Sequence, residues 1–175
     1  MRRAAHLVSR FLGSLRPLAL DAETMAWVDR TLEPGELRVW EGLGAADRAE
    51  SVAVARRLDA ADSTWTAAAL LHDAGKQASA YGPLGRAVVT VVAAGAGNET
   101  VRGWAASTHR VRGRMGCYAA HDVIGAELLA AAGARPAVIA WAEAHHRPDR
   151  WTATGIPPGV CRALAAADGE PVPRP

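Results

Sequence analysis

Apolar residues recur at helical spacing along most of the chain. Val52, Val54, Ala55 and Leu58 mark one apolar face within residues 45–58, where arginines occupy polar positions. Segments of similar character, separated by glycine- or proline-containing turns, cover residues 1–20, 22–32, 36–42, 64–75, 118–132, 136–146 and 157–168. The pattern predicts an all-α protein, folded as a compact bundle of roughly six to eight helices.

Residues 81–116 carry the most ambiguous pattern. The β-branched residues Val88, Val89, Val91 and Val92 favour a strand, although one buried turn of helix would contain the same residues. We predict a helix because the segments on both sides are helical. We interpret residues 108–116, which are basic and contain glycine, as a connection between helices.

Composition agrees with a helical protein and excludes several functional classes. Hydrophobic residues make up 50% of the chain and are dominated by alanine, the strongest helix former. The net charge of +2 does not favour nucleic-acid binding. No apolar run approaches the ~20 residues that span a bilayer. The two cysteines, Cys117 and Cys161, form no metal-binding or disulfide pattern, so we expect reduced thiols in a cytoplasmic protein.

Histidines concentrate where predicted helices begin or end. Together with two aspartates, they are His72-Asp73, His121, His145-His146 and Asp168. Adjacent side chains within a helix diverge by about 100°, whereas a chain leaving a helix can direct two neighbours towards one point. Neutral imidazole and carboxylate are ligands for zinc, iron, manganese and magnesium. We therefore expect these helix ends to meet around a divalent metal.

Four segments in this order resemble a known family. Residues 70–76, Leu-Leu-His-Asp-Ala-Gly-Lys, are similar to the HDxGK signature of the HD-domain superfamily of metal-dependent phosphohydrolases. Residues 118–129, 141–146 and 165–169 resemble the family's single-His, His-His and closing Asp segments. We predict an HD domain at 43–169, after an N-terminal helical extension at 1–42 and before a flexible tail at 170–175.

The resemblance implies a metal site and a reaction. Its ligands for one or two divalent ions would be Glu50, His72, Asp73, His121, His145, His146 and Asp168. Asp73 and Lys76 would be the catalytic residues of a hydrolase that uses metal-activated water on a phosphate ester. That ester could be a phosphomonoester, a phosphodiester or a nucleotide. Its phosphates would contact Lys76, Arg110, Arg112, Arg114 and Arg147.

Glu50 is the main departure from the family pattern. Single-metal members usually have a histidine there, so Glu50 is either an oxygen ligand or a mark of lost activity. A third interpretation is a capping box formed with Asp47. Gly155-Ile156-Pro157 also replaces the Gly-Tyr-Pro of the HD-GYP branch, which argues against cyclic dinucleotide hydrolysis. The alternative function is therefore a weak or inactive HD domain that binds a nucleotide or a partner protein in signalling.

Overall fold

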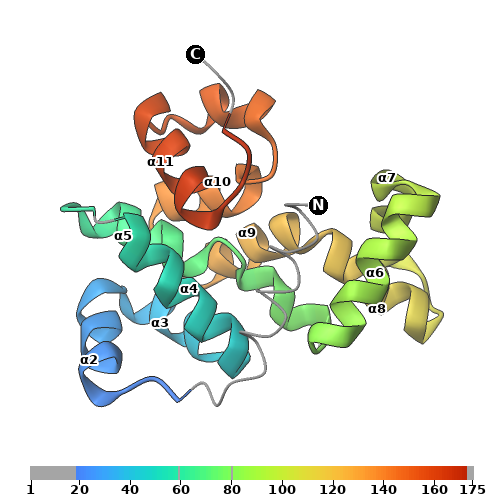
Figure 1. The fold of residues 1–175 in the computed structure, drawn as a ribbon, viewed down its shortest axis with the longest axis horizontal. Helices are drawn as coiled ribbons and strands as arrows, with labels where there is room; N and C mark the ends of the chain where they lie inside the picture. The colour runs from blue at the N-terminus through green and yellow to red at the C-terminus, as the bar shows by residue number, and fades with distance from the viewer. Residues whose placement is uncertain (1–18, 59, 80, 173–175) are drawn as a thin grey trace, which may run out of the picture.

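A computed structural model describes residues 19–58, 60–79 and 81–172 (Figure 1). Within these ranges it contains helices and no strands. They are α2 (Ala22–Thr31), α3 (Pro34–Glu41), α4 (Ala45–Leu58), α5 (Ser63–Leu71), η1 (Ala74–Ser79), α6 (Pro83–Ala96), α7 (Asn98–Gly103), η2 (Trp104–Ala106), α8 (Arg110–Ala119), α9 (His121–Ala131), α10 (Pro136–Ala144), η3 (Pro148–Thr154) and α11 (Pro158–Asp168). The all-α prediction is confirmed.

The number of helices exceeds the predicted six to eight. The excess arises mainly in residues 81–116, where the prediction of helix over strand is confirmed but the helix is divided into α6, α7, η2 and α8. Gly97 has a φ of 89°, a conformation that ends α6 and that residues with a side chain rarely adopt. The predicted connection at 108–116 is wrong, because α8 begins at Arg110. Most of the helix predicted over residues 1–20 lies outside the described residues.

Local sequence signals account for several helix starts. The carboxylates of Asp21 and Asp62 accept hydrogen bonds from the main-chain N–H groups of Thr24 and Thr64, at 2.7 Å and 2.8 Å. α4 covers the predicted residues 45–58, but Asp47, expected in a capping box, lies inside the helix. Asp47 forms an ion pair with Arg86 of α6, so it serves tertiary packing in place of the expected N-cap.

The main core surrounds α5. Its residues 66–71 are all buried, and α5 packs against α4, α10, α11, α3 and α2. Alanines dominate the buried face of α5, so neighbouring helices can approach closely, while Leu70 and Leu71 fill the space between them. None of the described helices combines the length and apolar character required to cross a membrane.

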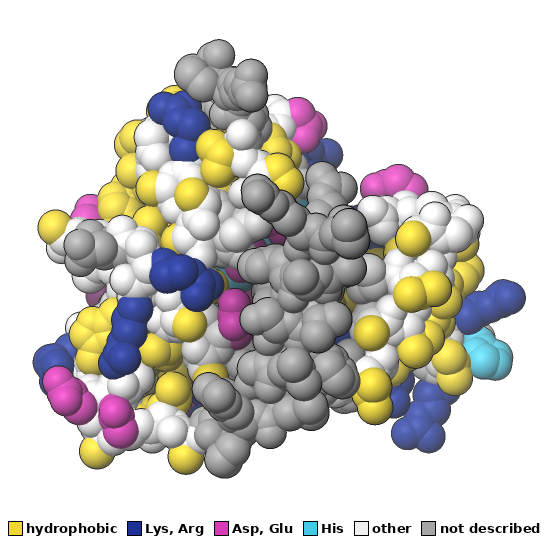
Figure 2. All heavy atoms as spheres, viewed as in Figure 1, with side chains coloured by type: hydrophobic (Ala, Val, Ile, Leu, Met, Phe, Trp, Pro, Cys, Tyr) yellow, Lys and Arg dark blue, Asp and Glu magenta, His cyan; other side chains and the backbone are white. Residues whose placement is uncertain are grey.

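A second, smaller core holds α6, α7 and α8 together. It is built from Val89, Val101 and Met115, and Figure 1 shows these helices to one side of the main bundle. The opposite face of α6 exposes Leu84 and Val91, and Figure 2 shows hydrophobic side chains on this part of the surface. This small α6–α8 lobe and the main bundle are linked through η1 and α9.

Candidate metal centre

Helix ends bring the predicted ligands to one place. His72 is the C-terminal cap of α5 and Asp73 follows it, while His145 is the C-terminal cap of α10 and His146 follows it. His121 is the first residue of α9. Each pair therefore leaves regular helical geometry where two adjacent side chains can face the same point, as the sequence predicts.

A close contact between two glycines places η1 against α9. A Cβ atom on Gly75 would lie 1.9 Å from the main-chain oxygen of His121 and 2.6 Å from the nitrogen of Gly125. A side chain at position 75 therefore cannot be accommodated without moving the backbone of η1 or α9. This contact lets Asp73, which immediately precedes η1, approach His121 at the start of α9.

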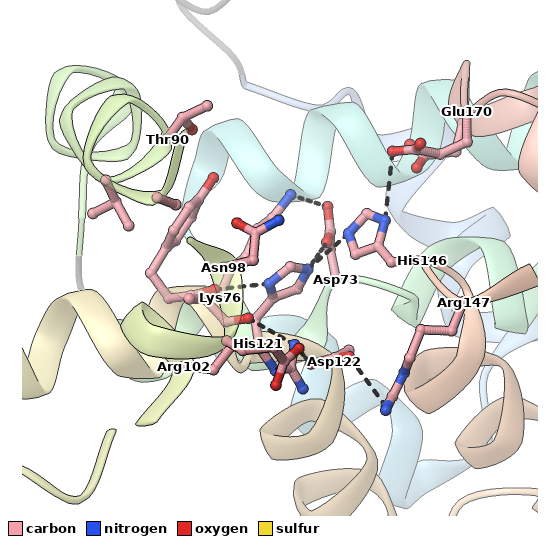
Figure 3. Close-up of a pocket in the computed structure, with 16 residues that line it drawn as sticks. Asp73, Lys76, Thr90, Asn98, Arg102, His121, Asp122, His146, Arg147 and Glu170 are labelled. Atoms are coloured by element: carbon pink, nitrogen blue, oxygen red, sulfur yellow. Dashed lines mark hydrogen bonds and ion pairs between the residues drawn. The ribbon is translucent and has the colours of Figure 1, made fainter. Parts of the chain in front are cut away.

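Four side chains form the centre of the site. Each of Asp73, His121, His145 and His146 offers one ligand atom, and these atoms all lie within 4.8 Å of one another. Nε2 of His121 lies 3.2 Å from Oδ1 of Asp73 and 3.2 Å from Nε2 of His146. Figure 3 shows His121 and His146 converging on the Asp73 carboxylate. Such a group could hold one metal ion.

His72 and Asp168 extend the cluster on the other side of Asp73. Nε2 of His72 lies 3.3 Å from Oδ2 of Asp73 and 3.4 Å from Oδ1 of Asp168. Asp168 is the last residue of α11, so this helix also contributes its end to the site. Six of the seven predicted ligands are thus brought together from α5, α9, α10 and α11.

Main-chain carbonyls orient three of the imidazole rings. Nδ1 of His72, His121 and His145 lies 2.9, 2.8 and 2.8 Å from the carbonyl oxygen three residues earlier. Because a carbonyl oxygen only accepts hydrogen bonds, Nδ1 carries the hydrogen in each ring. Nε2 then faces the cluster, where its lone pair can bind a cation.

Buried atoms without hydrogen-bond partners supply a test of whether the residues fit a metal. Among the described residues, Nε2 of His145 and Oδ1 of Asp73 are buried and have no hydrogen-bond partner. Burial, together with the nearby His146 and His72, lowers the pKa of His145 well below its ordinary value. A neutral imidazole and an ionised carboxylate both require an electron-pair acceptor here, and a divalent cation meets that requirement.

Asp73 lies among charged side chains that shift one another's pKa values. Burial opposes ionisation of Asp73, but Lys76 and His72 outweigh it and hold the pKa of this carboxyl well below its usual range. Burial also opposes charge on His72, yet Asp73 and Asp168 raise its pKa to about 10. Lys76 forms an ion pair with Asp73 that raises the lysine's pKa despite burial. A metal would therefore compete with the proton on His72.

Glu50, the seventh predicted ligand, forms an ion pair with an arginine. Its carboxylate is 3.5 Å from Nη2 of Arg57, and the two side chains are 43% and 49% exposed. Glu50 belongs neither to the group of four ligands nor to the lining of the adjacent cavity. Its role as a ligand stays a prediction.

A cavity of about 730 Å³ opens beside the metal-ligand cluster. Its lining includes Asp73, Lys76, His121, His146 and Asp168, together with Arg147, one of the predicted substrate contacts. The cavity reaches from these residues to α6 and α7, where Val89, Thr90 and Asn98 line it. The site can therefore admit a small molecule from solvent.

The three arginines predicted to contact substrate near position 112 do not line this cavity. The guanidinium of Arg112 lies over Trp104, 5.5 Å from the ring centre. Arg114 lies over Tyr81 and donates from Nε to the main-chain oxygen of Ser79 at 2.9 Å. Arg110 is exposed at the start of α8. None of the three shares the cavity lining with Arg147.

Asp122 and Arg102 are cavity residues that the sequence did not predict as part of the site. Asp122, whose side chain is 1% exposed, lies 2.9 Å from Nη1 of Arg102 and 3.3 Å from Nη2 of Arg147. The available signal was a second His-Asp pair, His121-Asp122, which repeats the dipeptide at 72–73. An acidic residue in the first turn of a helix is also common for purely structural reasons, so the dipeptide alone is not specific.

Comparison with known families gives one match. The family model described as HD domain matches residues 43–173. No curated protein and no solved structure matches the chain. The matched range contains all the clustered histidines and aspartates described above.

Proposed function

The chain belongs to the HD domain family, and on that premise we propose that the protein is a metal-dependent phosphohydrolase that cleaves a phosphate ester. The observation that carries the proposal is the convergence of four ligand atoms, from Asp73, His121, His145 and His146, within 4.8 Å of one another. Three of these residues, Asp73, His121 and His146, border a cavity that is open to a small molecule. A ligand group beside a binding cavity is the arrangement expected of a metal-dependent hydrolase.

The proposed roles follow from the position of each side chain. The three imidazoles with carbonyl-fixed Nδ1 atoms, those of His72, His121 and His145, would bind a metal through Nε2. Asp73 lies between the two halves of the cluster and would bridge them. When bound, a divalent metal would supply an acidified water and neutralise phosphate oxygens. His146 and Asp168 complete the ligand set.

Lys76 is proposed to contact the substrate. Its side chain lines the cavity and forms an ion pair with Asp73. The raised pKa of Lys76 keeps the ammonium group charged near neutral pH. An ammonium at this position would stabilise negative charge on the phosphate as the ester bond breaks, in the manner of other fixed cationic donors.

A second candidate function is an HD domain that binds a nucleotide or a partner protein without turnover. Glu50 favours it, because a carboxylate stands where single-metal members of the family usually have a histidine, and this carboxylate pairs with Arg57. This candidate requires the cavity to bind its ligand while hydrolysis is absent. Unlike the hydrolase, this function does not require Lys76 to carry a charge.

Hydrolysis measured before and after removal of metal distinguishes the two candidates. The full chain is stripped with a chelator, reloaded with manganese, iron or zinc, and assayed on aryl phosphomonoesters and phosphodiesters. We expect turnover only in a reloaded protein, and His109→Ala, which changes an exposed histidine at the start of α8, to retain it. Metal-loaded protein that binds the esters but hydrolyses none of them would instead support the binding module.

A further inference from the structure

One buried carboxylate holds two arginines in the wall of the cavity. Asp122 of α9 is 1% exposed, and its two oxygens face Arg102 of α7 and Arg147 beyond the end of α10. All three residues line the cavity that contains Asp73 and His146. Figure 3 shows them as a connected set below His121. Residues from three elements are therefore fixed beside the proposed metal centre.

The two guanidinium groups retain positive charge and hydrogen-bond donors. One carboxylate cannot neutralise two arginines, so the Arg102–Asp122–Arg147 set by itself carries a net positive charge. Glu99, whose carboxylate lies 4.0 Å from Nε of Arg102, is 95% exposed and offsets that charge only weakly. Arg102 uses Nη1 for the carbonyl of Ala119 at 2.9 Å, and Arg147 uses Nη2 for the carbonyl of Glu143 at 3.0 Å. Nε of Arg147 is buried without an acceptor among the described residues. The side chains are 22% and 25% exposed, so each also remains open to the cavity.

We propose that Arg102 and Arg147, held in place by Asp122, form a clamp for the non-bridging oxygens of a terminal phosphate. The substrate is therefore a phosphomonoester. The proposal rests on the phosphohydrolase function above and narrows its substrate class. Arginine matches phosphate geometry through paired N–H donors, and a phosphate fits better than a carboxylate beside metal ligands. Arg102 and Arg147 contact substrate, whereas Asp122 is a positioning residue.

The number of free phosphate oxygens gives the preference for a monoester. A phosphomonoester has three non-bridging oxygens and is mostly doubly charged above its second pKa of about 6. If one oxygen faces the candidate metal site around Asp73, two oxygens remain for the two guanidinium groups. A phosphodiester has only two such oxygens and a single charge, so one arginine would lose its partner. A buried or partly buried donor without an acceptor weakens binding.

Calorimetric titration of manganese-loaded protein with inorganic phosphate and with dimethyl phosphate tests the clamp directly. We expect tighter binding of inorganic phosphate by the wild-type protein. Arg102→Gln and Arg147→Gln should each weaken it about tenfold or more, the loss expected for a charged hydrogen bond, while changing dimethyl phosphate binding less. Arg102→Lys and Arg147→Lys should give intermediate affinities, because they keep the charge and lose the paired donors.

Arg150→Gln is the matched control. Arg150 is three residues from Arg147, is 53% exposed and pairs with the exposed Glu143, so its loss should leave phosphate affinity unchanged. Manganese content of every variant is measured in parallel. Unchanged phosphate affinity in both glutamine variants, or loss of manganese together with phosphate, would overturn the clamp. Wild-type protein that hydrolyses neither class of ester when loaded with manganese would overturn the phosphohydrolase proposal itself, so the two failures are distinguishable.

Discussion

At the scale of single residues, the candidate metal centre combines three oriented imidazole rings with the ammonium group of Lys76. The histidine rings at 72, 121 and 145 are oriented by main-chain carbonyls of the helix that each residue ends or follows. Lys76 instead places an ammonium group against Asp73. The lysine therefore stabilises the ionised carboxylate and at the same time opposes the approach of another cation.

Lys76→Met should separate metal binding from catalysis. Removal of the ammonium relieves charge repulsion, so we expect manganese to bind at least as tightly as in the wild-type protein. Turnover of a phosphate ester should fall about a hundredfold, as for loss of one donor to transition-state charge. Metal titration and kcat measurement on the same preparation check both parts. Turnover equal to that of the wild type would remove Lys76 from the mechanism.

The clustered histidines and aspartates were predictable from the sequence, as was a substrate contact at Arg147, whereas its partners Arg102 and Asp122 were not. His72, Asp73 and His145 occur in short motifs that can be recognised from the order of residues without knowledge of the fold. Arg102, Asp122 and Arg147 lie in or next to three different helices, and only the packing of α10 on α9 and of α7 on α8 brings their charges together. The prediction for the arginines at 110–114 rests on local charge alone, and local charge does not report which face of α8 meets the cavity.

At the scale of elements, the approach of η1 to α9 determines whether the two halves of the cluster meet. Gly75 lies against the backbone of α9, and a Cβ atom there would overlap the oxygen of His121. Gly95 in α6 provides a contrast, because a Cβ atom there would meet nothing within 4 Å. The same substitution should therefore have opposite effects at the two positions.

Gly75→Ala is expected to destabilise the protein by about 1–3 kcal/mol, the usual range for overpacking, and to weaken metal binding. Gly95→Ala should leave metal binding unchanged and stabilise α6 by up to about 1 kcal/mol, since alanine favours helix. Urea unfolding and manganese titration of both variants provide the comparison. A Gly75→Ala protein with wild-type stability and metal affinity would show that the close contact is not required.

Element prediction succeeded where hydrophobic periodicity was sustained and was less accurate where tertiary contacts divided the chain. α4 and α10 appear close to their expected ranges. In residues 81–116 the valines of α6 face both the small core and solvent, since Val89 is buried and Val88 and Val91 are exposed. A single hydrophobic stripe was therefore not visible in the sequence, and the breaks at Gly97 and before Arg110 could not be located from it.

At the scale of the whole molecule, a buried ion pair joins the first helices to the centre of the bundle. Glu36 in α3 is fully buried, and its Oε2 lies 2.6 Å from Nη2 of Arg135 at the start of α10. The same guanidinium donates to the main-chain oxygen of Thr31 at 3.1 Å. Removal of one partner would leave the other charge without compensation in the interior.

Glu36→Gln should reduce the free energy of unfolding by about 3 kcal/mol at neutral pH, as expected when a buried pair is broken. Burial opposes ionisation of Glu36, but hydrogen bonds from Arg135 lower its pKa below the ordinary 4.5. This contribution is therefore present above pH 4.5 and is lost as the pH falls through the lower, folded-state value.

Urea unfolding of both proteins between neutral and acid pH measures this dependence. The difference between wild type and Glu36→Gln should narrow as the pH falls, and Arg150→Gln, which breaks an exposed pair, should cost less than about 1 kcal/mol throughout. A difference that stays constant across the acid range would contradict a role for the ionised Glu36 carboxylate.

The most direct test of the account is the metal content of the full chain after loading with manganese and removal of unbound metal. We predict at least one ion per wild-type chain and a similar value for His109→Ala. The variants His121→Ala and His145→Ala, each of which removes one member of the four-ligand group, should retain far less. Equal metal content in all four proteins, or none in the wild type, would contradict a metal centre built from these helix ends.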